Sequence, residues 1–387
     1  MDALLNKIFP HYQKIRQTIH MYPELRYEEN HTAEVIAAEL TLLGIPFQMG
    51  IGKTGVVALL DTGKAGKTLA LRADMDALPI VEETHLPYQS KNVGVMHACG
   101  HDGHVATLLA AAHLLSKNSD RLTGKIKFIF QPAEEGGAGA KAMIVDGVLE
   151  NPKVDAIFGL HNHPGSPVGT LLTKPGCVMY GNHEFIINVR GQGGHAAQPE
   201  LANNPLVIAA DVVLALKQLH DELSVGDEPT VITMTQCKSG FTTNVIPDVT
   251  FLQGTIRAAS SKDFINASTK LKQVLTTIEN KYQATLELQY NEIYPPTINT
   301  KAEAEFVLAQ ARICLGEQNV ALKAKSARAA EDFSYFLNEV PGCYFFMGNG
   351  EKSACCHNAK YDFNDEIIKH GAKVFAQIAL AYLTPKN

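Results

Sequence analysis

The residues His97-Ala-Cys-Gly-His-Asp-Gly-His104 stand directly before the apolar, helix-forming run 105–115. They place a thiol, three imidazoles and a carboxylate beside two glycines. Cys99 and His101 are two positions apart, so in an extended segment their side chains would leave the same face. A soft thiolate beside an imidazole suits a transition metal, whereas the structural alternative is a reduced cysteine among surface histidines. The motif alone leaves both interpretations open.

Strand-like and helix-like segments alternate on both sides of this motif. Strands are expected over residues 55–60, 68–74, 125–131, 155–160 and 343–347, and helices over residues 105–115, 138–149, 302–315 and 366–383. This alternation indicates an α/β domain with a buried, largely parallel sheet.

The middle of the chain follows a different pattern. It contains a strand (184–190), a helix (205–220), two strands (230–238 and 249–258), a helix (262–282) and a last strand (285–290). This is the β-α-β-β-α-β order of a ferredoxin-like domain. We therefore expect an α/β domain formed by residues 1–181 and 295–387, with a ferredoxin-like domain, residues 182–294, inserted into it.

Composition excludes several classes of protein. The chain of 387 residues, 45% hydrophobic and 19% charged, is long enough for two globular domains. A net charge of −6 offers no basic surface for nucleic acid or an anionic membrane. No signal peptide and no apolar run of about 18 residues is visible. Seven cysteines without framework spacing argue against a disulfide scaffold and favour a reducing cytoplasm.

Candidate catalytic residues gather where expected strands end. Three strand ends carry pairs of such residues: Asp74 and Asp76, Glu134 and Glu135, and His161 and His163. Open α/β sheets place ligand sites at the carboxyl ends of their strands. One of two adjacent glutamates can ligate a metal while the other carries a proton, although a solvated acidic turn is the alternative. Together with the cysteine motif, four such clusters make coincidence a poor explanation.

Two sequence patterns resemble nucleotide-binding motifs, but the elements expected after them do not fit such motifs. Gly50-Ile-Gly-Lys-Thr-Gly55 fits G-x-G-x-x-G, and residues 61–68 approach a P-loop. A strand rather than a helix is expected after each of them, so the geometry that cradles phosphate is missing. No G-x-S-x-G occurs, which excludes a serine nucleophile elbow.

A set of motifs, in order over nearly the whole chain, resembles the amidohydrolase branch of the aminoacylase and carboxypeptidase metallopeptidases. Besides residues 97–104, the motifs are Leu71-Arg-Ala-Asp-Met-Asp-Ala-Leu-Pro79, Gln131-Pro-Ala-Glu-Glu-Gly-Gly137, Gly159-Leu-His161, Gly191-Gln-Gly-Gly-His-Ala-Ala197, Thr243-Asn-Val-Ile-Pro-Asp248, Ala330-Glu-Asp-Phe333 and His357-Asn-Ala-Lys-Tyr-Asp-Phe-Asn364. That branch includes hippurate hydrolases, indole-acetyl-amino-acid hydrolases and N-acetyl-diaminopimelate deacetylases.

The resemblance implies a site for two divalent metal ions. The matching ligand positions are Cys99, His101, Glu135, His161 and His357. Glu134 matches the general acid/base, and Asp76 matches an aspartate that orients a ligand. Asp74 stands where carboxypeptidase relatives carry a ligand histidine, and its role here is left open. The donor set argues against magnesium and calcium but does not decide among zinc, manganese, cobalt and nickel.

The resemblance also assigns roles to the inserted domain. His195 matches a lid histidine that in dimeric relatives reaches the partner's active site and polarises the scissile carbonyl, and Asn244 matches a residue near it. Arg257 and the backbone of Gly348 and Gly350 are candidates for holding the substrate carboxylate, with a structural ion pair as the alternative for Arg257. We expect a homodimer through this domain, with a tetramer left open.

The implied reaction is hydrolysis of an N-acyl or N-aroyl L-amino acid, as in hippurate hydrolases and aminoacylases. Glu134 would take a proton from a metal-activated water and deliver it to the leaving amine. A dipeptidase or carboxypeptidase on the same scaffold is the nearest alternative. A non-catalytic metal-binding homologue is a further one, against which the intact Glu134–Glu135 pair argues. Cys355 and Cys356 are interpreted as packing residues, with oxidation sensitivity as the alternative.

Overall fold

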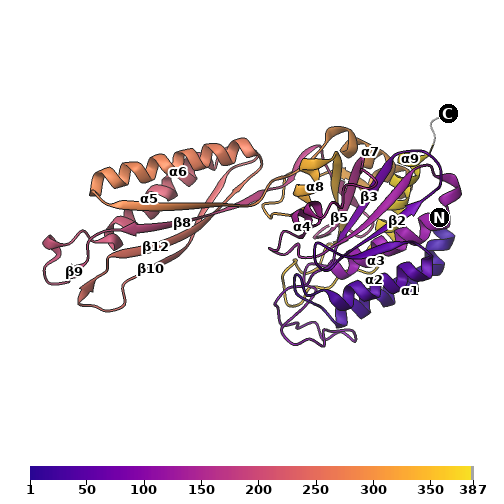
Figure 1. The fold of residues 1–387 in the computed structure, drawn as a ribbon, viewed down its shortest axis with the longest axis horizontal. Helices are drawn as coiled ribbons and strands as arrows, with labels where there is room; N and C mark the ends of the chain where they lie inside the picture. The colour runs from indigo at the N-terminus through magenta and orange to yellow at the C-terminus, as the bar shows by residue number, and fades with distance from the viewer. Residues whose placement is uncertain (385–387) are drawn as a thin grey trace. The chain divides into compact units, whose positions relative to one another are not determined.

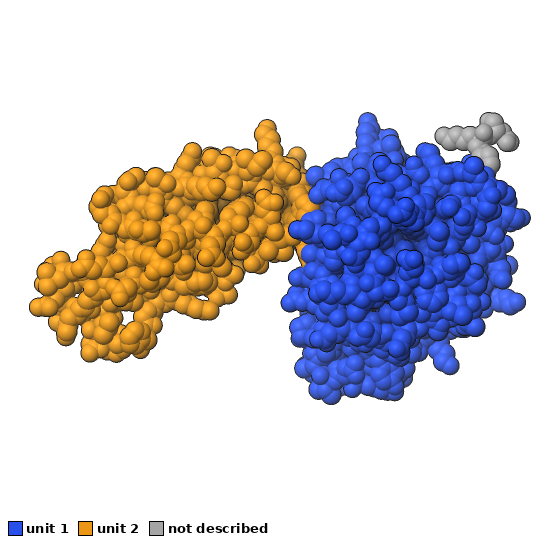
Figure 2. All heavy atoms as spheres, in the orientation of Figure 1, with its two compact units in different colours: residues 1–178, 298–324, 332–387 blue, residues 179–297, 325–331 orange. Residues whose placement is uncertain are grey.

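The computed structural model describes residues 1–384 and divides into two compact units, coloured separately in Figure 2. Unit 1 comprises Met1–Val178, Ile298–Ala324 and Asp332–Asn387, and unit 2 comprises Met179–Thr297 and Lys325–Glu331. The second segment of unit 2 lies outside the expected insert of residues 182–294. It groups with unit 2 because the Tyr180 N–H donates to the Ala327 carbonyl at 2.8 Å.

Unit 1 contains an eight-stranded sheet in the order β1-β2-β4-β3-β5-β16-β6-β15. The strands are β1 (Phe47–Ile51), β2 (Gly55–Asp61), β3 (Thr68–Asp74), β4 (Lys125–Gln131), β5 (Ala156–Pro164), β6 (Leu171–Thr173), β15 (Val320–Leu322) and β16 (Gly342–Gly350). The four central strands β4, β3, β5 and β16 run parallel. At the edges, β1 with β2, β2 with β4, and β6 with β16 pair antiparallel. The α/β fold class is confirmed, with antiparallel edges that the sequence pattern does not indicate.

Helices cover both faces of this sheet (Figure 1). One group packs together over one face and consists of α1 (Asp2–Met21), α2 (Asn30–Leu43), α3 (His101–Ser116), α7 (Lys301–Leu315) and α9 (Glu366–Leu383). The short helices α4 (Gly139–Val145) and α8 (Phe333–Glu339) contact each other and the sheet. Every residue of α3 except His113 and Ser116 is buried, because its sequence is apolar on all sides. This helix is therefore a rigid base for the residues at its start.

Helix α3 begins at His101, four residues before the expected start. Gly100 caps it with φ +93°, a left-handed conformation that favours glycine. A Cβ atom on Gly100 would lie 2.5 Å from Asn162 Oδ1 and 2.6 Å from the Tyr361 hydroxyl. The expectation of an extended segment from Cys99 to His101 is therefore wrong. The two side chains are brought together by a left-handed turn at the helix start.

Unit 2 has the predicted β-α-β-β-α-β order. Its elements are β8 (Gly181–Arg190), α5 (Pro205–Leu223), β10 (Val231–Ser239), β12 (Val249–Ala258), α6 (Ser261–Tyr282) and β13 (Thr285–Tyr294). The strands form an antiparallel sheet in the order β10-β12-β8-β13, and α5 and α6 pack on it around one apolar core. This is the ferredoxin-like arrangement. A separate small sheet joins β9 (Gly194–His195) to β11 (Val245–Ile246).

No helix among residues 1–384 is long and apolar enough to cross a membrane.

Candidate metal centre

The predicted ligands in unit 1 are brought together at the carboxyl end of the parallel strands. Asp74 ends β3, Glu134 and Glu135 follow β4, His161 lies on β5, and His357 belongs to the segment between β16 and α9. Cys99 and His101 flank the start of α3. Because parallel strands end at one edge of a sheet, residues far apart in sequence meet there.

The five predicted ligands form two overlapping groups that share Cys99. Cys99, His101 and His161 place one ligand atom each within 4.8 Å of one another, and so do Cys99, Glu135 and His357. Cys99 Sγ lies 3.3 Å from His161 Nε2, and His357 Nε2 lies 3.1 Å from Glu135 Oε1. A thiolate common to two groups of borderline-soft ligands suits two neighbouring transition-metal ions.

His101 shows directly that the donors fit a metal ion. Its side chain is buried, and its Nε2 has no hydrogen-bond partner among residues 1–384. Leaving a buried polar atom unpaired costs free energy, so such atoms in native structures have a partner of some kind. A metal ion beside Nε2 would supply that partner.

Asp76 holds both His101 and the adjacent glutamates. Its Oδ1 accepts the Glu134 N–H at 3.0 Å, and its Oδ2 accepts the Glu135 N–H at 2.9 Å. The Nδ1 of His101 lies 2.9 Å from the Asp76 carbonyl oxygen and 3.3 Å from Oδ1. In the neutral ring Nδ1 therefore carries the proton, and a metal ion would take the Nε2 lone pair in place of a second proton.

His161 and His163 lie two residues apart on β5 and have different surroundings. His161 Nδ1 donates to the Asn162 carbonyl at 2.7 Å, so its Nε2 lone pair faces Cys99. His163 contacts Ser166 Oγ at 3.0 Å and Lys323 Nζ at 3.3 Å. Only His161 stands beside the other candidate ligands, which supports its choice over His163.

Glu134 is 6% exposed and stands at the inner side of this cluster. A carboxylate oxygen of Glu134 lies within 4.8 Å of ligand atoms of His101 and Glu135. Ala133, directly before it, has φ +55°, which turns the chain sharply after β4. The two neighbouring carboxylates therefore differ in their contacts: Glu135 faces His357, whereas Glu134 lies beside His101 and Glu135.

The ionisable groups of the site change one another's pKa values. Burial lowers the pKa of His101, but the charges of Asp74 and Asp76 outweigh it and raise that pKa to about 10. A hydrogen bond between Cys99 and Cys356 raises the pKa of Cys99 and lowers that of Cys356 to about 6. These shifts favour the thiolate on Cys356 and the thiol on the predicted ligand Cys99, so a metal ion bound at Cys99 would have to displace the Cys99 proton.

In unit 2 the structure brings His195 and Asn244 together. β9 pairs with β11 so that His195 opposes Val245, and the Ala196 N–H donates to the Asn244 carbonyl at 3.1 Å. The Nδ1 of His195 accepts the Ala197 N–H at 3.0 Å. The neutral imidazole therefore carries its proton on Nε2, which can donate to an oxyanion.

Arg257 lies half-buried on β12 of the same unit, and its Nη1 donates to Asn182 Oδ1. It forms no ion pair with a carboxylate among residues 1–384. Burial lowers its pKa, and Glu184 partly offsets this. A half-buried guanidinium with a neutral partner is available to an anionic group.

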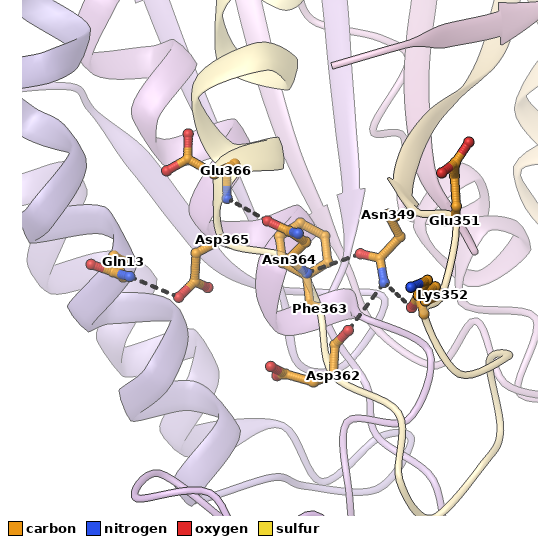
Figure 3. Close-up of a pocket in the computed structure, with 11 residues that line it drawn as sticks. Gln13, Asn349, Glu351, Lys352, Asp362, Phe363, Asn364, Asp365 and Glu366 are labelled. Carbon is orange, nitrogen blue, oxygen red and sulfur yellow. Dashed lines mark hydrogen bonds between the residues drawn. The ribbon is translucent and has the colours of Figure 1, made fainter. Parts of the chain in front are cut away.

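The geometry contradicts the predicted role of Gly348 and Gly350. Their N–H groups already donate to the carbonyls of Thr170 at 3.0 Å and Ser166 at 2.8 Å. Gly350 also lines a cavity of about 690 Å³ whose wall contains four carboxylates, all labelled in Figure 3: Glu351, Asp362, Asp365 and Glu366. With four carboxylates against one cation, Lys352, the wall of this cavity disfavours a carboxylate ligand.

Three residues near the metal centre were given no role from sequence, although one of them, His104, belongs to the motif of residues 97–104. Arg72, His104 and Asn162 are each at most 2% exposed and hydrogen bond within the cluster. The available signal was chemical, since Arg72 is a charged residue inside an otherwise apolar strand. Asn162 carries no such signal, because it stands between two more conspicuous histidines.

Known proteins resemble this chain throughout its length. A family model described as peptidase family M20/M25/M40 matches residues 70–381. Thermostable carboxypeptidase 1 of Saccharolobus solfataricus is 39% identical over 377 residues, covering 95% of this chain and 94% of its own. Hippurate hydrolase of Campylobacter jejuni is 36% identical over 372 residues, covering 96% of each chain. A crystal structure of a dinuclear metal-binding peptidase of family M20 from Bacillus subtilis superposes with a TM-score of 0.87 at 30% identity, covering 98% and 99% of the two chains.

Proposed function

Because this chain belongs to the peptidase family M20/M25/M40 and is a hydrolase, we propose that it cleaves the amide bond of N-acyl or N-aroyl L-amino acids. The proposal rests on one observation: two groups of possible metal ligands share Cys99, and Glu134 lies beside them. Nucleophilic attack on an amide at neutral pH requires an activated water and a group that protonates the leaving nitrogen. The cluster in unit 1 offers ligand atoms for metal ions, which would activate the water. It also offers the Glu134 carboxylate, which can protonate the leaving nitrogen.

We propose that two divalent metal ions are held by the five ligands described above, as the dinuclear relative supports. Bound in this way, they would supply Lewis-acid activation of the attacking water and polarise the substrate carbonyl. Asp76 keeps His101 in the tautomer that presents Nε2, and it fixes the Glu134–Glu135 turn.

The protein's own residues carry the protons and the substrate. Glu134 takes a proton from the attacking water and delivers it to the leaving amine. His195 stabilises the oxyanion by a hydrogen bond from its Nε2–H group as charge develops there. Asn244 lies beside His195 and supports it, and Arg257 binds the carboxylate of the amino-acid part.

A cavity in unit 1 supports an apolar acyl group. It has a volume of about 410 Å³ and is bounded on one side by the predicted ligand Glu135. Leu25, Ala77, Leu78 and Pro79 give it apolar walls, with Arg26 and Glu28 also lining it. Small-molecule sites combine such walls with a few polar groups. We assign the acyl or aroyl group of the substrate to this cavity.

A carboxypeptidase or dipeptidase activity is the second candidate. The carboxypeptidase from Saccharolobus solfataricus is as similar to this chain as the hydrolase relatives are. The same metal centre would serve both reactions, since both break an amide next to an amino acid with a free carboxylate. The difference is whether the acyl part carries an amino group.

We also propose that the protein acts as a homodimer in a reducing compartment. Strand β10 is one of the two edge strands of the sheet in unit 2, and α5 beside it exposes Leu206, Val207 and Leu214. An unpaired strand edge next to exposed apolar side chains favours pairing with a second copy. All seven cysteines are free thiols, which supports the proposal that the protein acts in a reducing compartment.

The test is hydrolysis of a small substrate panel by the full chain. Hippurate, N-acetyl-methionine, N-acetyl-diaminopimelate and a dipeptide are offered to chelator-stripped protein and to protein reloaded with Mn²⁺, Zn²⁺, Co²⁺ or Ni²⁺. The proposal expects metal-dependent release of free amino acid from an acylated substrate. Cleavage of the dipeptide alone would favour the carboxypeptidase candidate. Metal binding without any turnover would contradict the proposed substrate class.

A further inference from the structure

Asp74 has no part in the proposed reaction, although it is fully buried beside the metal ligands. It ends β3, and both of its carboxylate oxygens are engaged by side chains of unit 1. Oδ2 accepts from Arg72 Nη1 at 2.7 Å, and Oδ1 faces His104 Nδ1 at 2.5 Å. An aspartate with this geometry holds its neighbours in fixed orientations.

Arg72 is itself immobilised, so it can fix Asp74. Its Nε donates to Gln131 Oε1 at 2.8 Å, and its Nη2 lies 3.1 Å from Asp332 Oδ1. The guanidinium also lies 5.6 Å from the centre of the Phe333 ring. A planar, fully buried cation with three polar partners leaves one position for the Asp74 carboxylate.

His104 links Asp74 to the residues of the metal centre. Its Nε2 is 2.7 Å from Asn162 Oδ1, and the Asn162 carbonyl accepts from His161 Nδ1 at 2.7 Å. The His104 ring packs against the ring of His161, with ring centres 4.8 Å apart. Asp74 thus connects through His104 and Asn162 to a predicted metal ligand.

The alternative is that Asp74 binds metal directly. Asp74, His101 and His104 do place ligand atoms within 4.8 Å of one another, and Asp74 Oδ2 lies 3.7 Å from His101 Nε2. Against this, Oδ2 is bonded to Arg72, whose positive charge neutralises the carboxylate and repels a cation. Direct ligation would require breaking a buried ion pair.

We propose that Asp74 is a positioning residue of the metal centre: it fixes His104, and through His104 and Asn162 it sets the direction in which His161 presents Nε2. This inference rests on the proposed function, because it concerns the same metal centre. Metal binding rather than turnover therefore provides the main readout.

The test compares the full-length wild type with Asp74→Asn and a matched control, Asp102→Asn. Asp102 forms a similar buried triad with Arg16 Nε at 2.8 Å and His20 Nδ1 at 2.8 Å. Each protein is stripped with a chelator and titrated with Co²⁺, whose absorption bands report thiolate binding and ligand geometry. Affinity is measured by competition with a chelator.

We expect Asp74→Asn to bind two Co²⁺ ions at saturation, with altered bands and an affinity about 10–100-fold weaker at one site. Asp102→Asn should keep the wild-type bands and affinity, although it too loses a buried ion pair. A second variant, His104→Gln, interrupts the same chain while leaving the Arg72–Asp74 pair intact. It should shift the bands in the same way even if Asp74→Asn fails to fold.

Three results would overturn the inference. Unchanged bands and affinity in a folded Asp74→Asn or in His104→Gln would remove the positioning role. Loss of one ion from Asp74→Asn at saturating Co²⁺ would make Asp74 a direct ligand. Equal changes in Asp102→Asn would make the effect unspecific. A wild type that binds no metal would instead refute the proposed function itself.

Discussion

At the scale of single residues, His161 and His163 show how position decides chemistry. Both imidazoles leave β5 on the same side, but His161 is turned toward Cys99 by its hydrogen bond to the Asn162 carbonyl. Burial lowers the pKa of His163 to about 4, so it is neutral and rests between Ser166 and Lys323. Only one of them is free to accept a metal.

These neighbours give a matched pair of variants. His161→Ala should lose at least one metal ion and reduce kcat by orders of magnitude, because it removes a predicted ligand. His163→Ala should keep the wild-type metal content and most of the activity. Metal content by mass spectrometry and kcat on an acylated amino acid measure both effects. Equal metal loss in the two variants would contradict the ligand assignment.

Some of the site is predictable from residue type and spacing, and some is not. The adjacent pair Glu134–Glu135 after a strand predicts a metal ligand beside a proton carrier, and in the structure Glu135 contacts His357 while Glu134 lies near His101. Whether the backbone N–H of Gly350 is free could not be judged from sequence. It donates to the carbonyl of Ser166, a residue far away in the chain that only the fold brings close.

At the scale of elements, the start of α3 depends on one glycine. Gly94 offers a comparison, because it also has a positive φ, +89°, but a Cβ atom there would have no neighbour within 4 Å, whereas a Cβ on Gly100 would meet Asn162 and Tyr361. We expect Gly94→Ala to cost about 1–2 kcal/mol through its backbone alone. Gly100→Ala should cost about 1–3 kcal/mol more, through these two contacts. Urea unfolding of the metal-free proteins measures the difference, and equal losses would contradict this account.

A buried ion-pair cluster joins α1 to α3. Burial acts to raise the pKa of Asp102, but Arg16 and His20 hold it well below its usual range. Its folded-state pKa is depressed, so its stabilising contribution is complete above the unfolded value of about 3.9 and declines as the pH falls from there toward the folded-state pKa. Asp102→Asn should therefore destabilise the protein by about 3 kcal/mol at pH 7 and by about 1 kcal/mol less at pH 3. The free energy of unfolding of both metal-free proteins at the two pH values checks this, and a difference independent of pH would contradict it.

Elements with a regular hydrophobic pattern were predictable from sequence. Elements whose bounds depend on contacts with residues remote in the sequence were not. Strand β4 has the predicted bounds, and the six elements of unit 2 appear in the predicted order. The start of α3 was misplaced because its first turn carries polar residues that are buried against remote side chains. The antiparallel edge strand β1 was missed because its middle residues are exposed, so it lacks a buried face.

At the scale of the whole molecule, dimer formation is the property most open to test. Leu214 on α5 is 63% exposed and lies on the proposed contact surface, whereas Ile265 on α6 is 67% exposed and lies outside it. Leu214→Asp should shift the protein toward monomer, and Ile265→Asp should leave a dimer. Sedimentation at micromolar protein concentration measures both. A wild type that is already monomeric, or equal behaviour of the variants, would contradict the proposed interface.

The central claim is that Glu134 carries the proton in a metal-dependent amide hydrolysis. Its most direct test is kcat together with metal content for Glu134→Gln, with Glu83→Gln as an exposed control. We expect Glu134→Gln to keep its metal ions while kcat on an acylated amino acid falls by about 10²–10⁴-fold, and the control to keep the kcat of the wild type. Near-normal turnover by Glu134→Gln with metal bound would contradict the account.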